Sequence, residues 1–275
     1  EVLSLPKFEV NASRDVGYFS TETLAGTRSA KALVDVPGSI AIINREMIED
    51  FNTSNFDDVL KYGVSGVTPN DEVIDDLNIR GFRQVNPFRD GVESVGAMIN
   101  QTFDLERLEV VKGPSAMVFG NTSVLGGTVN FVSRKPTAIP VRDIKVTVGE
   151  NSFLRSELNL SGPVTEAKDI RYRLTLGGQV DDRTKEIESD DQLFAGGAMT
   201  FDFADTTISL YGYHFNKAGY TYYNDFLDNR ITTGIMQLNP NSTKYFGPAR
   251  SDDVFTEQNE NFFSASWVTQ LKHNL

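Results

Sequence analysis

The sequence predicts an α+β domain of about 100 residues, followed by a long antiparallel β-sheet. From Val34 to Pro136 the chain consists of short strand, turn and helix units. Beyond Pro140, apolar and polar residues alternate strictly over long segments, which indicates strands with one apolar face. The 275 residues are 39% hydrophobic, enough for buried cores. We therefore expect an extended N-terminal segment over 1–33, an α+β domain over 34–137 and a strand-rich region over 138–275.

Two helices are expected in the first half of the α+β domain. GSIAIINREMIED predicts a strand through Ile40–Ile43 and then a helix whose N-cap is Asn44, with glutamates in its first turns. NFDDVLKYGVSGV predicts a helix that starts near Asn55 and ends at Gly63. After Thr68 the chain is interpreted as strands joined by loops, with the strand segments LNIRGF, PFRDGVES, LERLEVVKG and GGTVNFVSRK.

Beyond Pro140 we expect six strands, near 143–149, 152–162, 170–181, 191–204, 206–217 and 260–271. In SFLRSELNLSG, Leu154 and Leu158 point to one face while Arg155 and Glu157 point to the other, because successive side chains alternate along a strand. IRYRLTLGGQV and NFFSASWVTQL divide in the same way.

The connections between these strands alternate between short turns, as at 163–169 and Asp205, and long polar segments, as at DDRTKEIESDD and about 218–258. This pattern, on strands of about ten residues with one apolar face, is typical of an outer-membrane barrel. Aromatic residues near the strand ends suit an interfacial belt: Tyr172, Phe201, Phe203, Tyr211, Tyr213 and Trp267. A soluble antiparallel sandwich also alternates, so it stays an alternative on pattern alone.

Composition narrows the classes of partner. A formal charge of -12 repels nucleic acid backbones, so no nucleic acid partner is expected. Zero cysteines remove disulfides, thiolate metal sites and cysteine nucleophiles. The sequence has no run of about 18 apolar residues, so it predicts no transmembrane helix. A transmembrane β-barrel stays possible. The polar start predicts that any export signal has already been removed.

No constellation of side chains predicts catalysis, a metal site or a cofactor. GNTSVLGG lacks the spacing and the Lys-Ser/Thr ending of a phosphate-binding loop. Neighbouring carboxylates such as Asp190 and Asp191 would point to opposite faces of a strand. The two histidines, His214 and His273, have no ligand-spaced neighbour, and His214 is interpreted as a wall or belt residue. We therefore predict that the protein is not an enzyme.

Six motifs in order carry a family resemblance across about residues 34–136: DVPGSIAIINREMIED, LKYGVSGVTPN, NIRGF, RDGV, DLERLEVVKGPSAMVFG and LGGTVNFVSRKP. Together they resemble a TonB-dependent outer-membrane receptor, most closely the siderophore-receptor branch. The resemblance implies that an α+β plug domain precedes a 22-stranded antiparallel transmembrane β-barrel and sits inside it. About 138 residues follow Thr137, enough for six strands, so we expect the chain to be part of a longer receptor.

The resemblance gives the apolar, proline-containing segment at the N-terminus a role. In the family a TonB box ahead of the plug pairs, as an added strand, with a TonB-type energy-coupling protein in the periplasm. The box is expected at Leu3, Ser4, Leu5, Pro6, Lys7, Phe8, Glu9 and Val10. On composition alone, a disordered tail is the alternative.

The resemblance also implies a plug–barrel lock, in which basic residues of the plug pair with barrel glutamates. The matching residues are Arg80 of NIRGF and Lys112 before the Gly-Pro corner. Lysine at the second position departs from the more usual arginine and would lose bidentate geometry. The alternative is that each is a solvated basic side chain.

Outward plug loops bind the ligand in similar receptors, and here they would be 68–73, 83–87 and 93–102. The candidate contact residues are Thr68, Asn70, Arg83, Gln84, Asn86, Met98, Asn100 and Gln101. The implied function is import, from the bacterial outer membrane to the periplasm, of a small-molecule ligand, most simply a ferric siderophore. Uptake of an oligosaccharide or another nutrient, and a non-transporting surface receptor or adhesin, are the alternatives.

Overall fold

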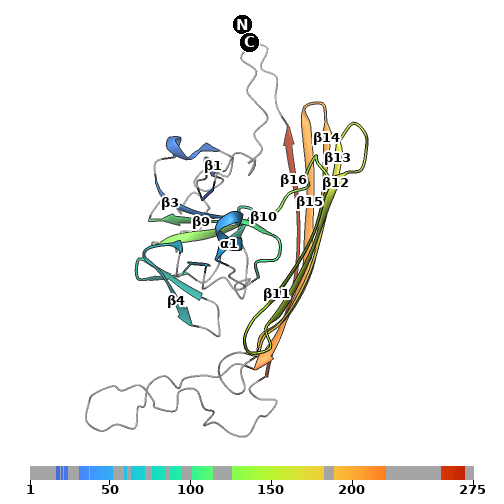
Figure 1. The fold of residues 1–275 in the computed structure, drawn as a ribbon. Helices are drawn as coiled ribbons and strands as arrows, with labels where there is room; N and C mark the ends of the chain where they lie inside the picture. Colours follow the sequence, from blue (N-terminus) through green and yellow to red (C-terminus); the bar gives the residue numbers. More distant parts are fainter. Residues whose placement is uncertain are drawn as a thin grey trace, which may run out of the picture. The chain divides into compact units, whose positions relative to one another are not determined.

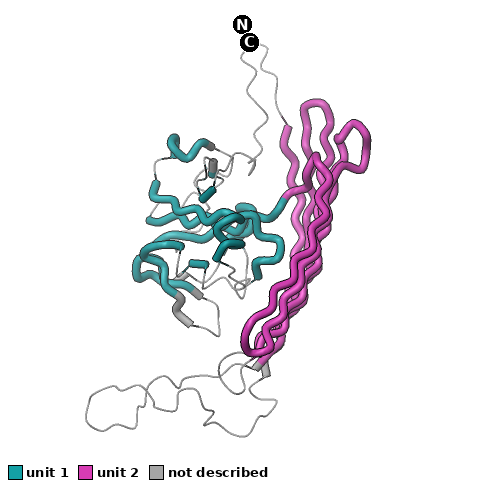
Figure 2. The backbone as a smooth tube through the Cα atoms, viewed as in Figure 1, with its two compact units in different colours: residues 1–134 teal, residues 135–275 magenta. Residues whose placement is uncertain are grey.

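The computed structural model describes residues 17–18, 20, 22–23, 31–36, 38–51, 59–60, 63–71, 76–84, 87–93, 101–113, 126–182, 189–220 and 255–269. The chain forms two compact units, an N-terminal unit over residues 1–134 and a C-terminal unit over residues 135–275 (Figure 2). Within the described ranges, no helix has both the length and the apolar character needed to cross a membrane.

The N-terminal unit is built on a five-stranded sheet with the order β3-β9-β10-β7-β8 (Figure 1). Its strands are β3 (Ser39–Asn44), β9 (Leu105–Lys112), β10 (Gly127–Ser133), β7 (Phe88–Arg89) and β8 (Val92–Glu93). Strand β9 pairs antiparallel with both β3 and β10, and β10 pairs parallel with β7. The longest strand therefore has a partner on each side.

Helix α1 (Arg45–Asp50) begins directly after β3, as the sequence predicts. The Asn44 side chain accepts a hydrogen bond from the backbone N–H of Met47 at 3.1 Å, which satisfies one of the free donors of the first helical turn. The predicted strand and its Asn44 helix cap are confirmed. Of the second predicted helix, Val59 and Leu60 lie within the described residues, and both are helical and buried.

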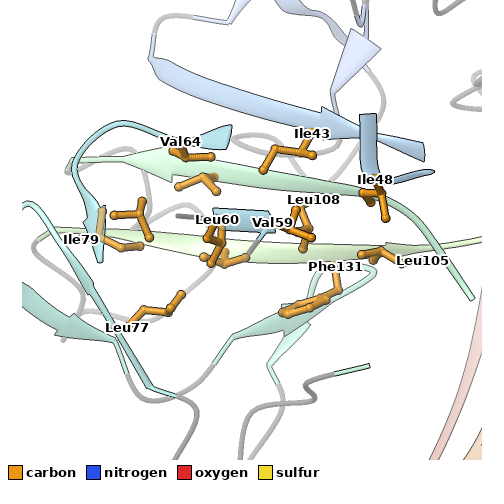
Figure 3. Packing of buried hydrophobic residues seen from close by; sticks show 13 residues of the cluster. Ile43, Ile48, Val59, Leu60, Val64, Leu77, Ile79, Leu105, Leu108 and Phe131 are labelled. Carbon is orange, nitrogen blue, oxygen red and sulfur yellow. The ribbon is translucent and has the colours of Figure 1, made fainter. Parts of the chain in front are cut away.

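One face of the sheet carries the main hydrophobic core (Figure 3). Leu108 and Phe131 project from the central strands, and Ile48 and Leu60 cover them from helical segments. Val67, Leu77 and Ile79 close the cluster from the small sheet formed by β4, β5 and β6. All of these side chains are buried, and each fully buried one contributes about 1.5–3 kcal/mol relative to exposure.

The small sheet corrects the prediction that LNIRGF is one strand. It contains β4 (Val67–Asp71), β5 (Asp76–Ile79) and β6 (Phe82–Gln84). Between β5 and β6 the chain reverses at Arg80 (φ 53°) and Gly81 (φ 83°). Two successive positive φ angles are what a two-residue hairpin needs, and glycine supplies one of them without strain. The motif is a hairpin turn that presents Arg80 at its tip.

Three smaller elements precede β3 along the chain. Strand β1 (Glu22–Thr23) pairs with β2 (Lys31–Ala32), and the short helix η2 (Leu33–Asp35) follows.

A hairpin similar to the one at Arg80 lies within PFRDGVES. Strands β7 and β8 are joined by Asp90 (φ 50°) and Gly91 (φ 80°), the Asp-Gly pair that favours such turns. This predicted strand segment is therefore also two strands and a turn.

The C-terminal unit is a meander in which each strand pairs antiparallel with the next (Figure 1). Its strands are β11 (Val141–Val148), β12 (Leu154–Pro163), β13 (Ile170–Val180), β14 (Asp191–Phe203), β15 (Thr206–Tyr220) and β16 (Phe255–Thr269). All six lie where the sequence predicts them. The largest shift is in β16, which begins at Phe255 rather than near residue 260.

The two faces of this sheet have opposite chemistry and opposite exposure. On the apolar face, Phe263 and Trp267 are 73% and 76% exposed. On the polar face, Arg155 and Glu157 are each only 5% exposed. A soluble sandwich would bury the apolar face and expose the polar one, and here the apolar face is the exposed one. This matches a wall whose apolar side meets lipid.

The aromatic belt stays a prediction, but the structure shows on which face its six expected residues lie. Phe201 is partly exposed on the apolar face, opposite Ile170. Tyr172, Phe203 and Trp267 are exposed on the apolar face. Tyr211 and Tyr213 lie on the polar face, because odd-numbered residues of β15 alternate with its apolar-face residues Ile208 and Leu210. On that face, ring centroids 5.4–5.9 Å apart join the aromatic cluster Phe194, Tyr211, Tyr213 and Phe262.

Candidate functional site

The Arg80 hairpin of the N-terminal unit lies on a glycine platform. A Cβ on Gly126 would stand 2.1 Å from the carbonyl oxygen of Ile79. A Cβ on Gly127 would stand 2.9 Å from the Ile79 side chain. Both distances are too short for a side chain at either glycine. The two glycines therefore allow the LGG motif to pack closely against the NIRGF motif.

This platform brings Arg80 next to Lys112. Strand β9 ends at Lys112, and Gly113 continues with φ 89°. The Arg80 Nη1 atom lies 3.2 Å from where a Cβ on Gly113 would be, so the guanidinium lies directly against this glycine. The Lys112 Nζ donates a hydrogen bond to Ser65 Oγ at 3.3 Å. Two cations from motifs about 30 residues apart thus share one corner of the unit.

The electrostatics of the corner are unfavourable to a second cation. Partial burial lowers the pKa of Lys112, and the nearby charge of Arg80 lowers that pKa further. Among the residues that the structure describes, no ion pair joins Arg80 or Lys112 to a carboxylate. The corner has the charge of an anion-binding position, and its predicted pairing with barrel glutamates stays a prediction.

A buried polar network joins the RDGV motif to the start of β9. The Arg89 Nη1 atom donates to Asp104 Oδ1 at 3.2 Å and to Ser133 Oγ at 3.0 Å. Gln101 Nε2 donates to the same carboxylate oxygen at 2.8 Å. The Arg89 guanidinium also lies 5.7 Å from the centroid of the Phe131 ring. A fully buried charge needs such partners, and these tie β7, β9 and β10 together.

Gln101 is one of the predicted ligand contacts, and the structure gives it a different task. Its side chain is 0% exposed, and both ends of its amide are used within the unit. Besides the bond to Asp104, its Oε1 atom accepts a hydrogen bond from the backbone N–H of Phe103 at 2.8 Å. Gln101 therefore holds the backbone and side chain just before β9, and its buried side chain would have to become accessible before a ligand could contact it.

A second buried ion pair was not found from the sequence. Arg107 and Glu109 lie side by side on β9, with Nη2 and Oε1 2.8 Å apart. The other carboxylate oxygen of Glu109 accepts from Asn130 Nδ2 at 3.3 Å, and Asn130 Oδ1 accepts from the N–H of Gly91. The signal was present: two opposite charges two residues apart on a strand share a face. Their burial was not readable from the sequence.

Four other predicted ligand residues lie on strands rather than in loops. Thr68 and Asn70 belong to β4, and Arg83 and Gln84 belong to β6. Thr68 is exposed. The physical reason is that both segments pair with β5, β4 on one side and β6 on the other, where the Arg80–Gly81 turn joins β5 to β6. Asn86, Met98 and Asn100, and the whole predicted TonB box from Leu3 to Val10, lie outside the described residues.

Side chains on the polar face of the C-terminal unit also form hydrogen bonds and ion pairs with one another. Arg155 Nε lies 2.7 Å from Glu157 Oε1, and Arg155 Nη1 donates to Gln179 at 3.0 Å. Tyr213 donates its hydroxyl hydrogen to Glu260 at 2.7 Å. Across the described ranges of both units, no group of three His, Asp or Glu side chains is arranged to hold a metal ion.

One known family model matches the part of the chain that carries these motifs. Residues 32–127 match the model of the TonB-dependent Receptor Plug Domain. The matched range includes the Arg80 hairpin, both buried ion pairs of the N-terminal unit and the first glycine of β10.

Curated relatives extend the match beyond that domain. The chain is 32% identical over 173 residues to the ferripyoverdine receptor of Pseudomonas aeruginosa, covering 58% of this chain and 21% of that protein. It is 28% identical over 165 residues to the ferrichrome outer membrane transporter/phage receptor of Escherichia coli, covering 56% of this chain and 22% of that protein. The chain thus spans about a fifth of the length of these relatives.

Solved structures agree on the fold. The ferripyoverdine receptor of Pseudomonas aeruginosa bound to ferripyoverdine superposes with a TM-score of 0.69 at 26% identity, covering 75% of this chain and 29% of that one. The siderophore receptor PiuA from Acinetobacter baumannii superposes with a TM-score of 0.75 at 19% identity, covering 94% of this chain and 37% of that one. The likeness to PiuA concerns the fold alone.

Proposed function

We propose that this chain is part of a TonB-dependent outer-membrane receptor that serves in the uptake of a ferric siderophore. The match of residues 32–127 to the plug-domain model supports the receptor class. The receptor would bind the ferric chelate outside the cell and pass it to the periplasm, using energy from a TonB-type protein of the inner membrane. The names of the relatives support the siderophore class, since they include receptors for ferripyoverdine and ferrichrome.

The observation that carries the proposal is the reversed exposure of the six-stranded sheet. Its apolar face is exposed at Phe263 and Trp267, whereas Arg155 and Glu157 of the polar face are buried. This arrangement suits strands that have lipid on one side and a polar lumen on the other. A plug-type domain preceding such strands supports a gated pathway rather than an open pore.

The Arg80–Lys112 corner is the proposed attachment point of the plug within the barrel. Burial and the neighbouring charge of Arg80 lower the pKa of Lys112, so the protonated lysine is unfavourable at this place. A carboxylate nearby would offset the positive charges of both Lys112 and Arg80. We assign this partner to acidic side chains of the barrel lumen. The Lys112 ammonium would contribute as a point charge, while Arg80 can offer a bidentate pair.

Ligand contacts are proposed on the small sheet and on the segments next to it. Thr68, Asn70, Arg83 and Gln84 lie on its two outer strands, β4 and β6, which flank β5. Together with Asn86, Met98 and Asn100 they offer hydrogen-bond donors, one cation and one apolar contact, which suits a polar and anionic chelate. Gln101 is left out of this set because its amide already serves Asp104 and Phe103.

The proposal is tested by separating binding from uptake in the full-length receptor. Cells that carry it receive a panel of ferric chelates and oligosaccharides, and surface binding and internal accumulation are measured. Deleting Leu3–Val10 should abolish accumulation and leave binding intact, because the added strand to the energy-coupling protein is lost. A Ser4→Ala variant is the matched control, since strand pairing through the backbone does not require that side chain.

Three results would contradict the proposal. Accumulation that persists without Leu3–Val10 would rule out energised import through this segment. Binding without accumulation in the unaltered receptor would favour a surface receptor or adhesin. Binding of oligosaccharides but no ferric chelate would favour a different nutrient.

A further inference from the structure

Two hydrogen bonds hold residues 17–18 against helix α1. Asn44 Nδ2 donates to the carbonyl oxygen of Gly17 at 2.6 Å. The Tyr18 hydroxyl donates to Asp50 Oδ2 at 2.8 Å. Asn44 is the N-cap of α1 and Asp50 is its last residue, so the bonds grip both ends of the helix. Gly17 has φ 60°, a conformation that glycine adopts without strain.

Asn44 performs two tasks with the two ends of one amide. Its oxygen caps α1 through the N–H of Met47, and its nitrogen holds Gly17. The side chain is buried, so both bonds are shielded from competing water. The N-terminal segment is therefore attached to the same atom group that starts the helix.

The position of this attachment along the chain has a mechanical consequence. Residues 19–43 lie between the two bonded positions, and they include β1, β2 and all of β3 except its last residue. A pull applied ahead of Gly17 reaches α1 directly through Asn44 and Asp50, without passing along residues 19–43. We infer that Gly17–Tyr18 and α1 form a force clip that shields this segment, and above all β3, from a pull on the N-terminus.

Helix α1 is well placed to receive such a load. Arg45 Nη1 donates to the carbonyl oxygens of Thr102 and Leu105, at 3.0 and 3.4 Å, at the start of β9. Ile48 is buried in the main core. From Asn44 and α1 the load passes into β9, which is paired on both sides, rather than along residues 39–43 of β3, which lies at the edge of its sheet.

The clip is weaker than the strand it shields. It consists of two hydrogen bonds, and Tyr18 is half exposed, whereas β3 pairs with β9 over six residue pairs. Under increasing load the clip opens first. The pull then reaches the β1–β2 pair, and only afterwards Ser39, the first residue of β3. The clip thus sets the force at which the N-terminal segment lengthens.

The chain offers substitutions that remove the clip and keep the helix. Tyr18→Phe removes the hydroxyl donor alone. Asn44→Asp keeps the oxygen that caps Met47 but loses the nitrogen that holds Gly17, and aspartate caps a helix as well as asparagine. Asp50→Asn is the matched control, because its amide oxygen can still accept from Tyr18. Hydrogen exchange at the Met47 amide checks that α1 is intact in each variant.

The test is single-molecule pulling on the N-terminus of the full-length receptor held in a membrane. The unaltered protein and Asp50→Asn should show a first event at the clip, followed by events at the β1–β2 pair and at β3. In the Tyr18→Phe/Asn44→Asp double variant, this first event should vanish, and the first resistance should come from the β1–β2 pair. If the double variant shows the same first event as the unaltered protein, or if the unaltered protein first resists at β3, the clip does not exist.

The inference rests on the proposed function only for the origin of the pull in the cell. The pulling experiment measures the clip directly, so its result does not depend on uptake. If accumulation persists without Leu3–Val10 while the first event is observed, the importer proposal fails and the clip stands. If accumulation needs Leu3–Val10 but the double variant pulls like the unaltered protein, the clip fails alone.

Discussion

Arg89 and Asp104 form a buried ion pair, with Nη1 and Oδ1 3.2 Å apart and side chains 0% and 3% exposed. They come from two motifs 15 residues apart, RDGV and DLERLEVVKG. The pair accounts for a charged residue at the end of β7 and for another just before β9. It also locates Gln101, whose amide completes the hydrogen bonding of the same carboxylate.

Replacing Arg89 by alanine should destabilise the N-terminal unit by about 3–5 kcal/mol, because Asp104 would be left as an uncompensated buried charge. Native-state hydrogen exchange at the amides of β10 in the full-length receptor measures this loss. Adding Asp104→Asn should recover part of the stability, so the double variant should cost less than the two single variants added together.

Arg134→Gln is the matched control for this cycle. Arg134 and Glu106 are 3.7 Å apart and partly exposed, so the loss should stay below about 1 kcal/mol. Equal losses for Arg89→Ala and Arg134→Gln would show that burial does not set the strength of these pairs.

Gly126→Ala should displace the Arg80 hairpin. The new Cβ would stand 2.1 Å from the Ile79 carbonyl oxygen, which is backbone and cannot rotate away. We expect a loss of about 1–3 kcal/mol from overpacking, together with faster exchange of the Arg80 amide, which donates to Gly66. Gly178→Ala is the control, since its nearest neighbours would be 3.9 Å away. Unchanged exchange at Arg80 would contradict the platform.

Arg80→Gln should raise the pKa of Lys112, although not to its ordinary value of 10.5. Burial is the larger cause of the lowered pKa and remains, whereas the repulsion from Arg80 disappears. The pKa is measured by NMR titration of the isotopically methylated amine, with Lys112→Arg identifying the signal. A pKa of Lys112 that does not change on removal of Arg80 would show that the two charges do not interact.

The same shift fixes the sign of a pH effect on stability. A cation with a lowered pKa makes the folded state less stable at pH values below that pKa. This cost disappears as the pH rises from the lowered pKa to 10.5. In Arg80→Gln, the gain in stability over this interval should be smaller than in the unaltered protein.

A fluorescent label at Phe263→Cys should be quenched strongly by nitroxides in the lipid chains, and a label at Ser264→Cys weakly. The chain has no cysteine, and these neighbours project from opposite faces of β16. Phe263 is 73% exposed on the apolar face. Equal quenching at both positions would contradict a lipid-facing wall.

The apolar face changes character within two residues of Phe263. Phe263 lies opposite Gly212, but the next pair on that face is His214 and Asn261, joined side chain to side chain at 3.0 Å. Beyond them, Asn216 donates to Asn259 at 2.8 Å. We predict the edge of the hydrocarbon layer between Phe263 and Asn261, so a label at Asn259→Cys should respond to headgroup quenchers and not to those in the lipid chains.

Local chemistry made a large part of this fold predictable. The alternation of Leu154, Arg155, Ser156 and Glu157 assigned each side chain to a face, because the period of a strand is fixed by its geometry. The Asn44 cap was predictable for the same reason, since an N-cap side chain bonds to backbone within three residues of itself. Features that depend on neighbours in sequence were therefore predicted well.

The turns at Arg80 and Asp90 show where that reasoning stops. NIRGF and FRDGV contain glycine after a polar residue, which permits a hairpin but does not require one. Pairing of β5 with β4 and β6 forms the hairpin at Arg80, and the hairpin packs on Gly126 and Gly127, which are distant along the chain. Tyr211 and Tyr213 were assigned to the lipid belt from their residue type, whereas the register of β15 places them with Phe262 on the polar face.

The sequence by itself determined the order of the elements, the two faces of the long strands and the cations at Arg80 and Lys112, because each depends on residue type and short-range spacing. Only the tertiary structure brought Arg80 onto Gly113 and Ile79 onto Gly126, paired Arg89 with Asp104, and fastened Tyr18 to Asp50. These contacts join residues that many chain positions separate. Their geometry is fixed by how strands and helix pack, and no local rule of propensity or periodicity specifies it.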